Sequence, residues 1–427
     1  MPGGVNMPDY QLRLGIFSKS YADLTDNEKE FINYFLRIKM HCISHVIDSL
    51  YTTGPHGYGS SLILTRIIKI KERISTDREL SDKLKRNELY RFVSKLDDYN
   101  VPSHNTYNSL RKRLDVEGYK QLHSNIVREA DSLGLLNPAI NGLPKNRREG
   151  IILIADSTFL KTTASTKGIK TDEGTWLFKD ESIAFGRPHH KHKYPVGHRA
   201  HTLMTLNGIP LVSLLGKASE SDKEFIFPLL DELMERYPYL KFSYLILDKI
   251  YDSEEIHQDI YEYYEITPVI IRKKMVYPKG FTKDGFPLCP FNYPMRRKGI
   301  DYANRRTQYC CFKTCLKDKN RLLFDCKHVH TKTKFGYSFY TLFEAGYRKY
   351  GPALPTMVIY KKLKPYRTCI ERTYGLVKEN RYRMEMNNTY IGHDNVLMHV
   401  IEHDIVLTQD IINDYLSFGK LSPVIKL

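Results

Sequence analysis

The chain has 427 residues, of which 41% are hydrophobic and 27% charged, as in a globular protein large enough for two or three domains. Its 65 Lys and Arg residues exceed its 49 Asp and Glu residues by 16, which favours a polyanionic partner, most simply nucleic acid. The absence of a long apolar run, of a secretory signal and of a disulfide-like Cys framework argues against membrane-spanning and secreted classes, so we expect a soluble cytoplasmic protein.

The N-terminal part of the sequence has a helical pattern. Residues 1–24 show little periodicity, and we expect them to be loosely ordered. Over residues 25–140 apolar side chains recur at three- and four-residue spacing, and Thr25 and Glu28 have the form of a capping box. Ser75 is placed to cap a later helix. We predict an all-helical, DNA-binding domain over 25–140, with Lys and Arg on its exposed faces.

Short apolar runs and helical patterns alternate after a polar linker, which indicates an α/β fold. The sequence predicts a hairpin that turns at Asn207-Gly208, and single strands over 151–156, 242–248 and 266–272. Residues 273–350 interrupt this rhythm with Pro, Gly, Cys and basic residues, and regular helix returns over about 365–409. We therefore predict one α/β domain that comprises 150–272 and 351–412, with 273–350 as a Cys-rich insertion.

Two acidic residues stand at the ends of predicted strands. Asp156 ends the first strand and Asp248 ends the fourth, where side chains project into a crevice if the strands are neighbours. A pair of carboxylates repels unless a cation compensates it, and Mg²⁺ prefers oxygen ligands. Glu371 lies on a basic helix that could cover the same edge. We predict a metal site at Asp156, Asp248 and Glu371, although each acid taken alone could equally be a turn, cap or surface residue.

Basic residues flank the third acid. Arg367 and Lys378 lie on turns of the helix near Glu371 and are suited to hold a phosphate backbone. The segment "MRRKGIDYANRRTQYCCFK", within the insertion, alternates basic and aromatic residues, which suits a surface that lies along DNA.

Five of the seven Cys residues lie between positions 289 and 326. Thiolates so concentrated favour a structural Zn²⁺ site, with Cys289, Cys310, Cys315 and Cys326 as the ligand set. The spacing is not that of paired Cys-x-x-Cys knuckles, so a group of buried free thiols is the alternative.

The motifs around the three acids resemble those of DDE transposases from bacterial and archaeal insertion sequences. Asp156 lies in "IADST", and residues 248–253, "DKIYDS", are similar to the family's Asp-Ala-Gly-Tyr-Asp-Ser. The family carries Tyr, two residues, Arg, three residues, Glu, six residues and Lys around its third acid. Arg367, Glu371 and Lys378 fit this spacing, with Lys364 at the Tyr position. The resemblance covers about residues 60 to 410.

The resemblance implies an α/β fold with a ribonuclease H-like mixed sheet and flanking helices, preceded by the helical domain and interrupted by the Cys-rich insertion. It also implies that Asp156, Asp248 and Glu371 hold two Mg²⁺ or Mn²⁺ ions for DNA cleavage and strand transfer. Arg199 and His201 lie at the positions of the family's Gly-x-Lys-x-His strand, which implies contact with DNA. Implied partners are double-stranded transposon ends and target DNA at the nucleoid, with a homodimer assembled on DNA.

Two other functions fit the same sequence. A metal-dependent ribonuclease H-like nuclease would cut DNA without joining it. An inactive transposase-derived protein would bind DNA only, although the presence of all three acids argues against decay.

Overall fold

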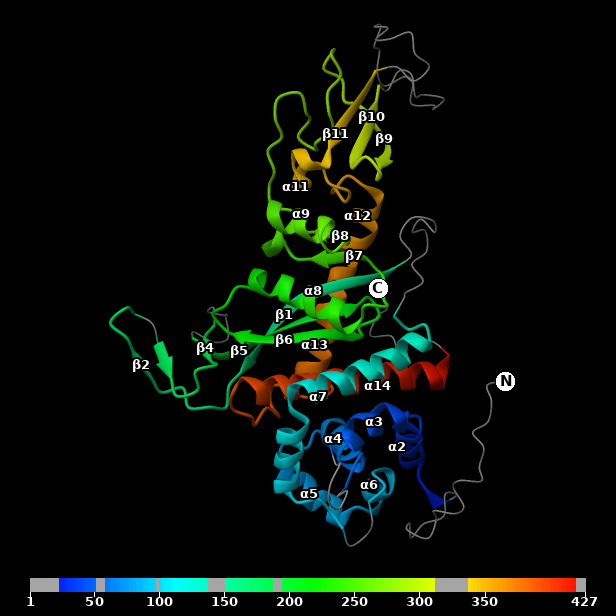
Figure 1. The fold of residues 1–427 in the computed structure, drawn as a ribbon, viewed down its shortest axis with the longest axis vertical. Helices are drawn as coiled ribbons and strands as arrows, with labels where there is room; N and C mark the ends of the chain where they lie inside the picture. The colour runs from blue at the N-terminus through cyan, green and yellow to red at the C-terminus, as the bar shows by residue number, and fades with distance from the viewer. Residues whose placement is uncertain are drawn as a thin grey trace. The chain divides into compact units, whose positions relative to one another are not determined.

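The computed structural model describes residues 23–50, 58–96, 100–136, 150–174, 176–186, 194–311 and 337–419 (Figure 1). The chain forms two compact units. The first unit comprises Met1–Pro138, Asp156–Pro238 and Cys369–Leu427, and the second comprises Ala139–Ala155 and Tyr239–Thr368. Within the described ranges, no helix is both long and apolar enough to cross a membrane.

The N-terminal part of the first unit is helical, as predicted. Its helices are α2 (Asp26–Leu36), α3 (Met40–Ser49), α4 (Ser61–Lys71), α5 (Asp77–Arg86), α6 (Glu88–Val93) and α7 (His104–Ser132). The capping box is confirmed, because the Thr25 hydroxyl accepts from the Glu28 amide and the Glu28 carboxylate accepts from the Thr25 amide. The prediction of Ser75 as a cap is wrong by one position. Thr76 caps α5, since its hydroxyl accepts the amide of Glu79.

The remaining elements of the first unit are two hairpins, a small edge strand and further helices. They are β2 (Gly168–Lys170), β3 (Trp176–Phe178), β4 (Ala184–Phe185), β5 (Val196–Thr205), β6 (Pro210–Lys217), the 3₁₀ helix η3 (Asp222–Phe225), α8 (Ile226–Arg236), the π-helical turn η8 (Leu376–Asn380) and α14 (His393–Phe418). The predicted hairpin is confirmed: β5 pairs with β6 in antiparallel register, and Gly208 takes a positive φ of 79° in the connecting turn.

The second unit contains parallel strands and the inserted segment. Its elements are β7 (Phe242–Leu247), the 3₁₀ helix η4 (Lys249–Tyr251), α9 (Glu254–Glu262), β8 (Thr267–Ile270), β9 (Arg296–Asp301), β10 (Arg306–Cys310), β11 (Ser338–Leu342), η6 (Phe343–Ala345), α11 (Tyr347–Tyr350), α12 (Val358–Leu363) and η7 (Lys364–Tyr366). Strands β9, β10 and β11 form a separate antiparallel sheet. Helix α13 (Arg367–Gly375) begins at the end of this unit.

Strand β1 (Ile151–Lys161) belongs to both units. Its residues Ile151–Ile154 pair in parallel with β7, and β7 pairs in parallel with β8. The strand order is β4-β5-β1-β7-β8, with β6 paired to β5. This mixed sheet with flanking helices, preceded by a helical region, confirms the predicted fold class. The first strand is longer than predicted, so Asp156 lies in the middle of β1 and not at its end.

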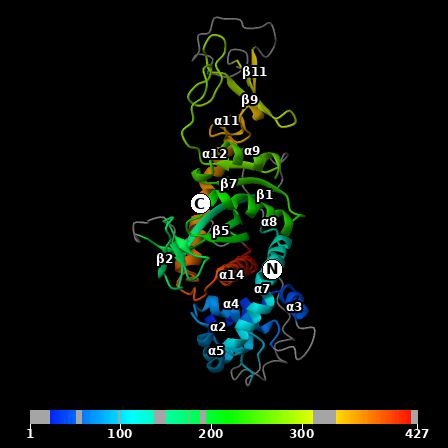
Figure 2. The same cartoon turned by 60° about the vertical axis from the view of Figure 1, so that its left-hand side comes forward.

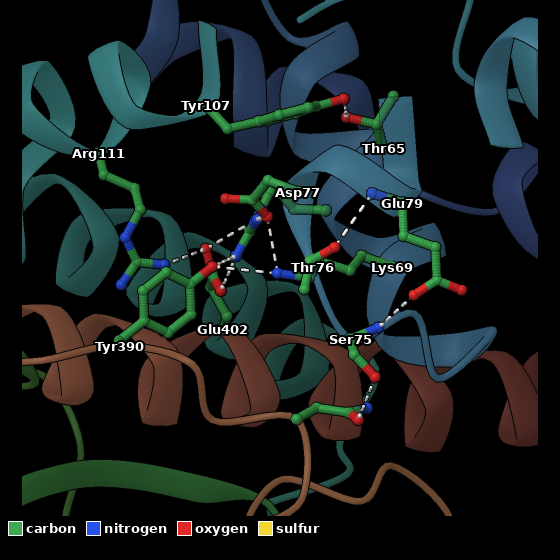
Figure 3. Close-up of polar contacts among 12 residues, drawn as sticks. Thr65, Lys69, Ser75, Thr76, Asp77, Glu79, Tyr107, Arg111, Tyr390 and Glu402 are labelled. Atoms are coloured by element: carbon green, nitrogen blue, oxygen red, sulfur yellow. Dashed lines mark hydrogen bonds and ion pairs between the residues drawn. The ribbon is translucent and has the colours of Figure 1, made fainter. Parts of the chain in front are cut away.

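Helix α14 forms the centre of the first unit and lies beside α7 in both views (Figures 1 and 2). It also packs against α4 and β6. Its buried Glu402 accepts hydrogen bonds from Arg66 and the hydroxyl of Tyr119. It also accepts one from Arg111 (Figure 3). Arg66 and Lys69 in turn pair with Asp77 at the start of α5. The helical N-terminal region is therefore joined to α14 by buried charge as well as by apolar packing.

The helical region predicted over about 365–409 is present but is interrupted. Helix α13 ends at Gly375, the π-helical turn follows, and α14 starts only at His393. Between the π-helical turn and α14, Arg383 and Gly392 have positive φ angles of 52° and 85°, which a continuous α-helix does not allow. The amide of Gly392 donates to Asp180, which fixes the start of α14.

Candidate active site

The first predicted acid lies on β1, close to the helix that carries the third. The hydroxyl of Tyr374 donates to the main-chain carbonyl of Asp156 at 2.8 Å. Tyr374 follows Glu371 by three residues, which is one turn of α13, and Glu371 is exposed. The first unit thus brings Asp156 and the Glu371 turn of α13 together. The sequence did not single out Tyr374, because a tyrosine on a helix carries no signal of its partner.

Asp222 provides a second carboxylate near Asp156, and it bonds Ser157, the next residue of β1. The hydroxyl of Ser157 donates to Asp222 at 2.7 Å, and Arg199 donates to the same carboxylate at 3.2 Å. Since neighbouring residues of a strand point to opposite faces, this group lies on the other face of β1 from Asp156. Asp222 was not among the predicted site residues, and its position at the start of η3 gave only a turn signal.

His201 is buried next to the same group. Its ring stacks on Phe225 with centroids 3.9 Å apart, and its Nδ1 lies 3.6 Å from Asp222. Burial lowers the pKa of His201 to about 4, although Asp222 acts in the opposite direction. The imidazole of His201 is therefore held in its neutral form, and Arg199 pairs with Asp222 beside β1. The predicted contact of both side chains with DNA stays a prediction.

Lys378 lies in the π-helical turn that follows α13. Its Nζ is 3.2 Å from the carboxylate of Glu385 and 5.9 Å from the ring centroid of Phe159, three residues after Asp156 on β1. Glu385 also accepts the amide of Lys161. Lys378 is thus held near the outer part of β1. A π-helical turn shifts the helix register, and such turns are frequent at functional sites.

The second predicted acid lies in the second unit. Asp248 follows β7 directly, as predicted, and its side chain is 40% exposed. Its carboxylate accepts the amide of Lys249 at 2.6 Å and lies 3.4 Å from the guanidinium of Arg367. The β1–β7 register aligns Ile154 with Ile246, and Asp156 and Asp248 each follow by two positions.

The three acids are carboxylates, and carboxylate oxygens suit hard divalent cations. Asp156 and Asp248 are partly exposed, and each accepts a hydrogen bond from the main-chain amide of the next residue. Within the described ranges of each unit, no three His, Cys, Asp or Glu side chains converge closely enough to hold a metal ion. The three acids are distributed over the two units, so each unit supplies only part of the predicted ligand set.

The Cys-rich segment is described only in part. Cys289 and Cys310 are buried thiols, and Cys289 packs with Met295 and Tyr309. Cys315 and Cys326 lie outside the described residues. The Zn²⁺ site therefore stays a prediction.

Comparison with known proteins identifies the family of the chain. The family described as "Transposase DDE domain" matches residues 147–400, a segment that contains all three acids. No curated protein matches the chain. Among solved structures, the chain is similar to a piggyBac transposase synaptic complex with hairpin DNA, with 11% identity and a TM-score of 0.34, over 95% of this chain and 78% of that chain.

The family match spans more than half of the 427 residues, so the chain belongs to the transposase DDE domain family. The protein is accordingly a DDE transposase.

Proposed function

We propose that this transposase cleaves DNA at the ends of an insertion sequence and joins those ends to target DNA, with Asp156, Asp248 and Glu371 as its catalytic acids. One observation carries the proposal. Within the first unit, the hydroxyl of Tyr374 ties the Glu371 turn of α13 to the main chain of Asp156.

The three carboxylates would hold two Mg²⁺ or Mn²⁺ ions, which would activate water or a DNA 3′-hydroxyl and stabilise the leaving oxygen. Ser157, Asp222 and Arg199 hold β1 beside Asp156, and Tyr374 holds α13 against it. Arg367, 3.4 Å from Asp248, offsets part of the negative charge that the acids accumulate. Arg367 and Lys378 are the basic residues that we assign to phosphate binding.

We assign the parts of the chain as follows. The helical domain over 25–140 binds the transposon ends, and the α/β domain over 150–272 and 351–412 performs the chemistry. The insertion over 273–350 presents the exposed Arg296, Lys298 and Tyr340 from its three-stranded sheet, a basic and aromatic surface suited to DNA. Because transposition joins two ends, we propose a homodimer on DNA, acting at the nucleoid in the cytoplasm.

The test is a cleavage and joining assay on double-stranded DNA that carries the element's own terminal sequences, with Mg²⁺. We expect Asp156→Asn, Asp248→Asn and Glu371→Gln each to lower cleavage and joining at least about a hundredfold, because several kcal/mol of charge stabilisation are lost. DNA binding should remain, and chelation of the metal should abolish both reactions of the wild type.

Asp231→Asn is the matched control, since it removes an exposed carboxylate of α8 inside the family segment. If all four variants cleave like the wild type, the three acids are structural and the proposal is wrong. Cleavage without joining would favour the nuclease, and binding without cleavage by the wild type would favour an inactive DNA-binding protein.

A further inference from the structure

Asp252, four residues after Asp248, is the most heavily bonded carboxylate of the turn that follows β7. Its side chain is fully buried. One oxygen accepts from His257 at 3.1 Å and from Arg272 at 3.3 Å. The other accepts from the amide of Lys273 and from Arg348, both at 2.7 Å. A buried carboxylate with four donors is fixed in position.

The donors come from separate parts of the second unit. His257 lies on α9, one turn after Asp252. Arg272 and Lys273 follow β8, where the inserted segment leaves the α/β domain, and Arg348 lies on α11, where that segment returns. Asp252 therefore binds both ends of the insertion through a single carboxylate group.

A short hydrogen-bonded turn connects Asp252 to Asp248. The amide of Tyr251 donates to the carbonyl of Asp248 at 3.1 Å, and the amide of Asp252 donates to that of Lys249 at 3.2 Å. Asp248 also caps this turn, because its carboxylate accepts the amide of Lys249. Because these hydrogen bonds connect the two ends of the turn, a shift of Asp252 is expected to reach the backbone of Asp248.

The electrostatics of the cluster make the carboxylate hard to replace. Burial alone would raise the pKa of Asp252, but hydrogen bonds from His257, Arg348 and the Lys273 amide hold it below its usual range. Burial lowers the pKa of His257 to about 4, so this ring stays neutral at neutral pH. Loss of the Asp252 charge would remove the carboxylate that Arg272 and Arg348 share. The guanidinium of Arg272 is buried, so its loss of a counter-charge would be costly.

We propose that Asp252 is a positioning residue that fixes the catalytic Asp248 and couples its position to the base of the 273–350 insertion. This inference rests on the proposed role of Asp248. Contacts made by the insertion, through Arg348 at one end and Lys273 at the other, would reach Asp248 through Asp252 and the turn.

The test uses the full-length protein with Asp252→Asn, Arg348→Gln and Arg348→Lys. Asp301→Asn is the matched control, because Asp301 pairs with Arg306 inside the insertion and does not touch the turn. Amide hydrogen exchange, followed by mass spectrometry, is expected to quicken roughly tenfold or more over residues 249–253 in Asp252→Asn and Arg348→Gln. It should stay unchanged in Asp301→Asn, and Arg348→Lys should recover part of the protection.

The second readout is Mn²⁺ binding, measured by electron paramagnetic resonance of the free ion. We expect binding to weaken about tenfold to a hundredfold in Asp252→Asn and Arg348→Gln, as for loss of a group that orients a ligand. A thermal melt shows which variants fold. If Asp252→Asn does not fold, Arg348→Gln decides, since it removes one donor of four.

Unchanged exchange over 249–253 in the folded variants would overturn the coupling. Faster exchange with unchanged Mn²⁺ binding would make Asp252 a structural residue only and would also overturn the proposal. Failure of the proposed function is separate: a wild type that neither binds Mn²⁺ nor cleaves DNA removes the role of Asp248, while the exchange data still decide whether Asp252 holds the turn.

Discussion

Two acids outside the proposed catalytic set, Asp222 and Asp252, support the backbone beside two acids within it. Asp222 bonds the residue after Asp156, and the amide of Asp252 closes the turn that begins at Asp248. The sequence placed Asp248 correctly, because a short apolar strand that ends on an acid is a local pattern. It could not identify these supports, since their partners are distant along the chain, as with Asp252 and Arg348, 96 positions apart.

Asp404 on α14 gives a prediction at the scale of one residue. It is buried and accepts a hydrogen bond from Ser213 at 2.7 Å. Burial raises its pKa to about 7, which Ser213 and Arg236 only partly offset. An unfolded Asp loses its proton near pH 4, so between about pH 4 and 7 the folded state binds more protons, and stability falls as the pH rises.

Asp404→Asn removes this penalty while it keeps the shape of the side chain. We expect it to raise the free energy of unfolding by about 1 to 3 kcal/mol at pH 8, and by less at pH 5, as measured by urea denaturation. The exposed control Asp231→Asn should change neither value by more than about 0.5 kcal/mol. A gain that is equal at both pH values would show that the charge of Asp404 is not the cause.

At the scale of elements, local sequence patterns predicted which helices, strands and turns exist better than where they begin and end. The hairpin at Asn207-Gly208 and the capping box at Thr25 are encoded within a few residues, and both are confirmed. The length of β1 and the break before α14 depend on partners elsewhere. The break is fixed by a bond from Gly392 to Asp180, 212 positions away, which no periodicity could reveal.

Helix α14 gives a prediction of its own, because it carries buried charge on the side that meets the N-terminal helices. Glu402 is 3% exposed and binds Arg66 through both of its oxygens. We expect Glu402→Gln to lower the free energy of unfolding by about 3 to 5 kcal/mol, because the buried Arg111 loses its counter-charge and the buried Arg66 keeps only Asp77. Urea denaturation at neutral pH measures the change.

Glu79→Gln is the control for α14. It removes a carboxylate from the exposed pair with Lys83 on α5, and we expect a loss of no more than about 1 kcal/mol. If Glu402→Gln cost no more than this control, the buried network would not be what joins α14 to the N-terminal helices.

For the whole molecule, the net charge of +16 bears on how tightly the protein holds DNA and how steeply salt weakens that binding. Within the insertion, Arg296 on β9 is exposed, whereas Arg305, whose side chain is 57% exposed, pairs with Glu262 at 2.7 Å. Composition predicted a polyanionic partner but could not rank these side chains, because their pairing depends on the fold.

The salt dependence of DNA binding tests this ranking. We expect Arg296→Ala to make the slope of log K against log salt concentration shallower by about 1, since it removes one phosphate contact. Arg305→Ala should leave the slope unchanged. Measurement by fluorescence anisotropy over a range of salt concentrations would show whether the β9 surface lies on DNA; equal slopes for the two variants would mean that it does not.

Both ends of the insertion meet at Asp252, and this arrangement affects how such a segment can be acquired. The Lys273 amide and the Arg348 guanidinium each lie 2.7 Å from the same oxygen. A segment whose ends already touch can be lengthened, shortened or exchanged with little change to the host sheet, because the cost of closing it grows slowly with its length. The part between the ends is then free to diverge among descendants of one ancestral gene, provided that the carboxylate and its arginines are inherited together.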